Sequence, residues 1–144
     1  MKKINLTLNE IYLLSVELEG FTDENGTKLV TGLLNQEISM TTKFWLKKLS
    51  KNVAEIKKEG EEIRNEIIKK YGDSGEDGNV SIPIYIDNAK GEKILNPSYL
   101  KVNEEFNKVL QDIHEIEYHE TPLADFADIK TSDNYEIIYK LVIE

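Results

Sequence analysis

Apolar residues recur every three or four positions between about Ser39 and Tyr71, and charged residues fill the positions between them. This spacing places the apolar residues on one face of an α-helix and predicts a single long amphipathic helix. A stripe this narrow favours a partner helix, from the same chain or from a second copy. The stripe consists of Leu46, Leu49, Val53, Ile56, Gly60, Ile63 and Ile67.

A second helix is predicted after Asn96, which is a favourable N-cap residue and is followed by Pro97 in the first turn. Gly60 weakens the long helix by about 1 kcal/mol relative to alanine, so we expect another element to approach it closely. We expect the second helix to pack antiparallel on the long helix. Its apolar stripe consists of Val102, Phe106, Val109 and Ile113.

The remaining patterns predict shorter elements. Thr7 and Glu10 form a capping-box pattern for a helix that ends near Gly20. After this helix, residues 23–26 predict a turn, and a short helical turn is expected within residues 28–38. Residues 80–86 and 92–95 predict a β-hairpin, in which Pro83 confines its strand to an edge. Residues 115–119 predict a strand edge and 121–126 a turn or short helix. Residues 132–143 fit a helix or a strand, with the helix favoured.

These elements predict an α+β fold that is mostly helical, in one domain over residues 1–144. The net charge is −9, and it lies in residues 73–144, which balance to −10, whereas residues 1–72 balance to +1. Such an acidic surface argues against a general nucleic-acid-binding protein, which needs a basic contact surface. The chain has no apolar run of membrane-spanning length and no cysteine, so we expect no membrane partner and a cytoplasmic location.

Two motifs around Gly72 imitate known sites. Residues 72–75 copy the Gly-Asp-Ser-Gly core of serine proteases, but the chain lacks the length and the supporting motifs for a catalytic triad. Residues 73–84 resemble a calcium loop, yet Ile84 stands where the bidentate glutamate is required. We interpret both as parts of a polar loop.

A third motif is the acidic segment that contains Glu115, Glu117 and His119. In an extended chain these three side chains project from one face, where two carboxylates and an imidazole suit a metal ion. The interpretation that we favour for this segment is a charged sheet edge that resists aggregation, with the metal site as the alternative.

The candidate ligand site consists of Trp45, Arg64 and Tyr71. An aromatic ring together with the only arginine of the chain suits a nucleotide-like anion, above all if self-association brings several copies together. The alternative is that these aromatic residues line an oligomer interface. The sequence has no phosphate-binding glycine loop, no HExxH motif and no paired cysteines. It therefore predicts no enzyme, no cofactor, no metal site and no catalytic residues.

The segment from Glu37 to about Glu120 resembles a group of small bacteriophage-encoded helical-hairpin proteins of unknown function. The resemblance rests on residues 43–49 (KFWLKKL), residues 62–72 (EIRNEIIKKYG), the following Asp-Gly loop, and residues 106–110 and 115–117. It implies a phage origin and a compact helical hairpin, and it assigns no catalytic residue.

We therefore expect a non-catalytic phage accessory protein that acts in the host cytoplasm by self-association and binding. Its expected role is to inhibit a host defence system, either by sequestering a nucleotide-like signal or by blocking a host protein. One alternative is a virion structural or assembly protein with phage structural proteins as partners. Another is a small metal-dependent enzyme.

Overall fold

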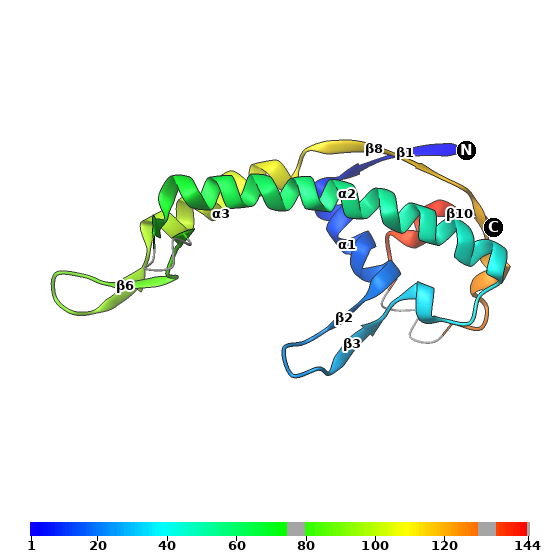
Figure 1. Cartoon of the computed structure of the whole chain (residues 1–144), viewed down its shortest axis with the longest axis horizontal. Helices are drawn as coiled ribbons and strands as arrows, with labels where there is room; N and C mark the ends of the chain where they lie inside the picture. The colour runs from blue at the N-terminus through cyan, green and yellow to red at the C-terminus, as the bar shows by residue number, and fades with distance from the viewer. Residues whose placement is uncertain (75–79, 130–134, 144) are drawn as a thin grey trace. The chain divides into compact units, whose positions relative to one another are not determined.

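The computed structural model describes residues 1–74, 80–129 and 135–143 (Figure 1). It is a mixed fold of α-helices, short 3₁₀ helices and two-stranded sheets, so the expected combination of helices with small sheets is confirmed. The chain forms two compact units: unit 1 is Met1–Lys57 with Ile113–Glu144, and unit 2 is Lys58–Asp112. That both belong to a single domain stays a prediction.

Unit 1 begins with strand β1 (Lys2–Thr7), which pairs antiparallel with β8 (Ile113–Tyr118). Leu6 and Ile116 are buried, whereas Lys3 and Glu117 face each other across the strands and are exposed. The strand edge predicted over residues 115–119 corresponds to the second half of β8, whereas β1 was not predicted.

Helix α1 (Leu8–Glu19) starts at the predicted capping box, in which Thr7 and Glu10 each accept a backbone hydrogen bond from the other. Its apolar face is buried in the core of unit 1. The helix ends at Gly20, whose φ of 88° is in the left-handed region that glycine adopts easily. Both predicted helix ends are therefore confirmed.

A small hairpin follows α1 and connects it to the long helix. Strands β2 (Gly20–Thr22) and β3 (Lys28–Thr31) pair antiparallel around the predicted turn, in which Asp23 accepts from the N–H groups of Asn25 and Thr27. The short helical turn expected within 28–38 is the 3₁₀ helix η1 (Leu33–Asn35). The strand before it was not predicted.

The long predicted helix is present as α2 (Met40–Tyr71), and Ser39 caps it by accepting a hydrogen bond of 3.2 Å from the N–H of Thr42. Leu46, Leu49 and Val53 are buried in the core of unit 1. Further along, Gly60 is buried but Ile63 is 41% exposed. The stripe thus contributes to the core of unit 1 from Leu46 to Ile56, and Ile63 does not continue the buried face.

Unit 2 contains the last turns of α2, the short pair β4 (Asp73–Ser74) and β5 (Val80–Ser81), and the hairpin of β6 (Tyr85–Asp87) and β7 (Lys93–Leu95). The single strand predicted over residues 80–86 was wrong, because residues 82–84, which include Pro83, interrupt it between β5 and β6. Helix α3 (Pro97–Leu110) begins at Asn96, whose side chain accepts from the N–H of Ser98 as expected. The assignment of Ile113 to this helix was wrong, because Ile113 begins β8 and is 68% exposed. The antiparallel packing of α3 on α2 stays a prediction.

The chain ends in unit 1. Strand β9 (Thr121–Pro122) precedes the 3₁₀ helix η2 (Leu123–Phe126), which agrees with the turn predicted there. The segment left open between helix and strand contains both, because the 3₁₀ helix η4 (Ile138–Leu141) leads into β10 (Val142–Ile143), which pairs parallel with β9. Residues 130–134 lie outside the described residues. So do residues 75–79, which belong to the protease-like motif (72–75) and the calcium-loop-like motif (73–84).

Within the described residues, no helix is long and apolar enough to cross a membrane.

Candidate functional site

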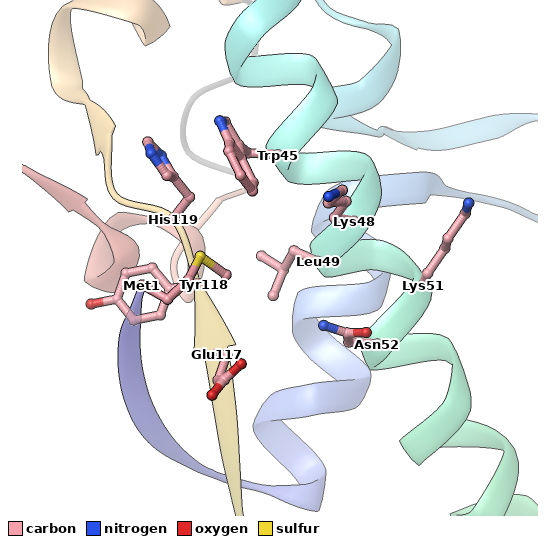
Figure 2. Close-up of a pocket in the computed structure, with 9 residues that line it drawn as sticks. All are labelled: Met1, Trp45, Lys48, Leu49, Lys51, Asn52, Glu117, Tyr118 and His119. Carbon is pink, nitrogen blue, oxygen red and sulfur yellow. The ribbon is translucent and has the colours of Figure 1, made fainter.

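A pocket of about 450 Å³ lies in unit 1 between helix α2 and the end of strand β8 (Figure 2). Leu49 of α2 lies in its middle, Trp45 and His119 lie at one end, and Asn52 and Glu117 lie toward the other end. The other residues that line it are Met1, Lys48, Lys51 and Tyr118.

The two aromatic rings at one end of the pocket are stacked. The indole of Trp45 lies 4.3 Å from the imidazole of His119, measured between ring centroids, and the two planes are inclined by only 6°. Trp45 is half-buried and His119 is exposed, so the stack forms part of the protein surface. A flat aromatic surface of this kind can extend its stack to a further planar group such as a nucleobase.

The positions of both rings follow from buried neighbours. Leu46, the next residue after Trp45, is anchored in the core, which fixes the orientation of Trp45 on the flank of α2. Ile116 is 2% exposed and holds β8 against the same core, so His119 emerges directly after the last residue of that strand. Two elements far apart in the sequence thus contribute one ring each.

Positive charge lies beside the rings. The Nζ atom of Lys48 is 5.1 Å from the centroid of the Trp45 ring and 4.8 Å from that of Phe44, within the range of cation–π attraction. Lys51 contributes a second lysine to the lining. Glu117 at the opposite end of the pocket lies 3.9 Å from Lys3. The pocket therefore combines an aromatic surface, an ammonium group, a carboxylate and the amide of Asn52.

Of the three residues predicted for a ligand site, only Trp45 belongs to unit 1, whereas Arg64 and Tyr71 belong to unit 2. The guanidinium of Arg64 lies 6.0 Å from the ring centroid of Phe106, and Arg64 lines a separate apolar pocket of about 260 Å³. That Arg64 and Tyr71 share a ligand with Trp45 stays a prediction.

Tyr71 takes part in a polar contact within unit 2. Its hydroxyl donates a hydrogen bond to Glu105, which also accepts from Lys70 at 3.1 Å. Both hydrogen bonds lower the pKa of the Glu105 carboxyl, and the bond from the Tyr71 hydroxyl has the larger effect. The hydrogen bond to Glu105 in turn raises the pKa of Lys70. The contact joins the end of α2 to α3.

The carboxylates of the possible metal site are directed to a lysine. Lys3 lies 3.3 Å from Glu115 and 3.9 Å from Glu117, while the His119 ring is stacked on Trp45. Among the described residues, which include these three, no group of three histidine, aspartate or glutamate side chains is arranged to hold a metal ion. The geometry instead resembles the charged sheet edge that the sequence favoured.

Lys48 had no predicted role, and His119 was predicted only as a candidate metal ligand. Lys48 was detectable, because residues three apart share a helix face and Lys48 follows Trp45 at that distance. The proximity of His119 to Trp45 depends on how β8 packs beside α2. No local pattern encodes it.

No protein-family model, curated protein or solved structure matches this chain, so the site is interpreted from its own geometry.

Proposed function

We propose that this protein is a non-catalytic, nucleotide-binding accessory protein of a bacteriophage, which acts in the host cytoplasm by self-association and by sequestering a nucleotide-like signal of a defence system. The observation that carries the proposal is the stack of Trp45 on His119 at the edge of a pocket with Lys48 beside it. The phage setting rests on the resemblance of residues 43–49 and 62–72 to small phage proteins.

The chemistry of a nucleotide matches each part of the pocket. A nucleobase stacks on aromatic rings, and its phosphate groups carry the negative charge that Lys48 attracts. The amide of Asn52 has both donors and an acceptor for the edge of a base, and the carboxylate of Glu117 accepts from ribose hydroxyl groups. A pocket of this size, with a few polar groups around an apolar middle, is typical of small-molecule sites.

A sequestering protein needs to hold its ligand without altering it. The proposed pocket suits this role because it supplies stacking and charge without a nucleophile held beside a base. In unit 2, the contacts of Glu105 with Lys70 and Tyr71 support the further proposal that α3 packs antiparallel on the end of α2.

The experiment is a thermal-shift screen of the protein against cyclic nucleotides and ADP-ribose derivatives. A ligand at a hundred times its dissociation constant adds about 2.7 kcal/mol to the free energy of unfolding. For a domain of this size we expect the melting temperature to rise by several degrees. A flat screen with folded protein would contradict the proposal and favour a host protein or a phage structural protein as the partner.

Matched variants assign any shift to the pocket. We expect Lys48→Ala to reduce the ligand-induced shift and Lys58→Ala, an exposed lysine of the same helix outside the pocket, to leave it unchanged. Trp45→Ala should abolish the shift, whereas Phe21→Ala, which removes a half-exposed aromatic ring of β2 that does not line the pocket, should leave it unchanged. A parallel Arg64→Ala arm tests whether Arg64 contributes to the same ligand.

A further inference from the structure

Strands β6 and β7 form a hairpin in unit 2 (Figure 1). Apolar side chains are exposed on both faces of this hairpin. Tyr85 is 60% exposed and Leu95 is 47% exposed, while Ile86 and Ile94 are 37% and 39% exposed. A two-stranded hairpin is only marginally stable alone in water, and clustered exposed apolar residues mark interaction surfaces. This hairpin therefore has the properties of a surface that another molecule covers.

The register of the hairpin defines its two faces. Tyr85 pairs with Leu95, Ile86 with Ile94, and Asp87 with Lys93. Because successive side chains of a strand point to opposite faces, Tyr85, Asp87, Lys93 and Leu95 share one face. We call these four residues the Tyr85 face. It has an apolar pair at one end and an acid–base pair at the other.

This arrangement is complementary to a copy of itself. Consider two hairpins that face each other through this surface, with a two-fold axis midway between them. The axis runs parallel to the strands and lies between β6 and β7. Rotation about it places β6 of one copy over β7 of the other. Paired residues lie at the same height along the strands, so Tyr85 of each copy then lies over Leu95 of the other. Asp87 likewise lies over Lys93 of the other copy. Each contact occurs twice, as in any isologous interface.

The charge of the surface also favours a second copy. The whole chain has a net charge of −9, so two copies repel each other when acidic surfaces meet. The Tyr85 face contains one acidic and one basic residue, and the two-fold arrangement brings opposite charges together. Face-to-face packing of two sheets at about 10 Å is the usual way in which such faces are buried.

We propose that two copies of this chain associate through the Tyr85 face, with Tyr85 on Leu95 and Asp87 on Lys93 across the two-fold axis. The proposal names the surface for the self-association in the proposed function, and it does not depend on a ligand at Trp45. A single hairpin gives a small interface, so the dimer dissociates on dilution.

The test is sedimentation velocity of the full chain over a range of concentrations, with a charge exchange across the axis. Asp87→Lys alone brings lysines together, and Lys93→Asp alone brings aspartates together. We expect each single variant to weaken the dimer by about tenfold or more, since like charges across an interface are strongly unfavourable. An equimolar mixture of the two variants restores opposite charges at both contacts, so it should dimerise again.

The mixture separates an interface effect from damage within the hairpin. A like-charge pair opposite each other within one hairpin destabilises that hairpin in the mixture as well, so local damage alone would not be rescued by mixing. Tyr85→Ser should also weaken the dimer. Phe21→Ser removes an aromatic ring of similar exposure from the β2–β3 hairpin of unit 1 and should not.

Two results would overturn the proposal in distinguishable ways. If the wild-type chain stays monomeric at the highest concentration tested, the protein does not self-associate, and both the Tyr85 face and the self-association of the proposed function are refuted. A wild-type dimer that both single charge variants leave intact would place the interface elsewhere and refute only the Tyr85 face. Neither result bears on the pocket at Trp45, which the thermal-shift screen tests separately.

Discussion

The carboxylate of Glu17 on α1 accepts a hydrogen bond of 3.1 Å from the backbone N–H of Ile138, which lies near the other end of the chain. The same carboxylate accepts from the N–H groups of Glu136 at 2.6 Å and Ile137 at 3.1 Å. Glu17 is only 4% exposed, and it satisfies backbone donors at the start of η4 that would otherwise be buried without a partner. One side chain thus fixes the C-terminal segment on the first helix.

We expect Glu17→Gln to lower the free energy of unfolding by about 2 kcal/mol, because a charged acceptor is lost and an amide donor is placed near backbone N–H groups. Urea denaturation of the two proteins measures the difference. The control is Glu136→Gln, which changes an exposed carboxylate beside the same contact and should cost far less. Equal stabilities for the wild type and Glu17→Gln would contradict this role.

Gly32 lies against the end of α1, where there is no room for a side chain. A Cβ atom at this position would lie 2.3 Å from the carbonyl carbon of Glu19 and 2.5 Å from the carbonyl oxygen of Leu18. We expect Gly32→Ala to destabilise the protein by about 3 kcal/mol through forced backbone movement. Thermal unfolding monitored by circular dichroism measures the loss.

The control for Gly32 is Gly26→Ala in the β2–β3 turn. Gly26 has a φ of 80°, and no atom lies within 4 Å of the position that a Cβ atom would take there. Only the backbone strain of about 1 kcal/mol is therefore expected for this variant. If both variants cost the same, the close approach of Gly32 to α1 would be wrong.

The Glu10 carboxyl predicts a pH dependence of stability. A hydrogen bond from Lys140 at 2.8 Å, and then those from the N–H and hydroxyl of Thr7, lower the pKa of Glu10 below its ordinary value. The unfolded chain therefore binds this proton at higher pH than the folded chain does. The resulting stabilisation is fully present above the unfolded pKa of about 4.3 and is lost as the pH falls through the folded pKa.

We expect wild type to be more stable than Glu10→Gln at pH 7, with a difference that shrinks as the pH falls below about 4. Urea denaturation of both proteins at a series of pH values between about 3 and 7 gives the two curves. A difference that stays constant across this range would show that the charge of Glu10 contributes nothing and that only its shape matters.

Local signals predicted most of the helix ends. At each helix start, a side chain satisfies a backbone N–H donor or a proline replaces it, all within one turn. The residues are Thr7 with Glu10 for α1, Ser39 for α2, and Asn96 with Pro97 for α3. Such contacts depend only on neighbouring residues. The long stripe of α2 also identified the buried residues Leu46, Leu49 and Val53 correctly. It failed at Ile63, because the periodicity of a helix does not indicate where its packing partner ends.

Contacts between distant segments were beyond local patterns. Strand β1 was missed because it is one half of a pair whose other half, β8, is more than a hundred residues away. For the same reason the sequence suggested Trp45 as a ligand residue but did not join it to His119. Arg64 and Tyr71 were grouped with Trp45 because an aromatic ring and the only arginine suit an anion, and residue type does not indicate that the long helix spans both units.

The central claim is that a nucleotide-like ligand stacks at Trp45, and the fluorescence of that residue tests it most directly. Trp45 is the only tryptophan in the chain, so its emission reports on this pocket alone. We expect the best nucleotide of the screen to quench the emission with saturation, Lys48→Ala to weaken the apparent affinity, and Lys58→Ala to leave it unchanged. A nucleotide that binds by calorimetry while the emission of Trp45 stays constant would contradict the account, and so would the failure of every nucleotide to bind.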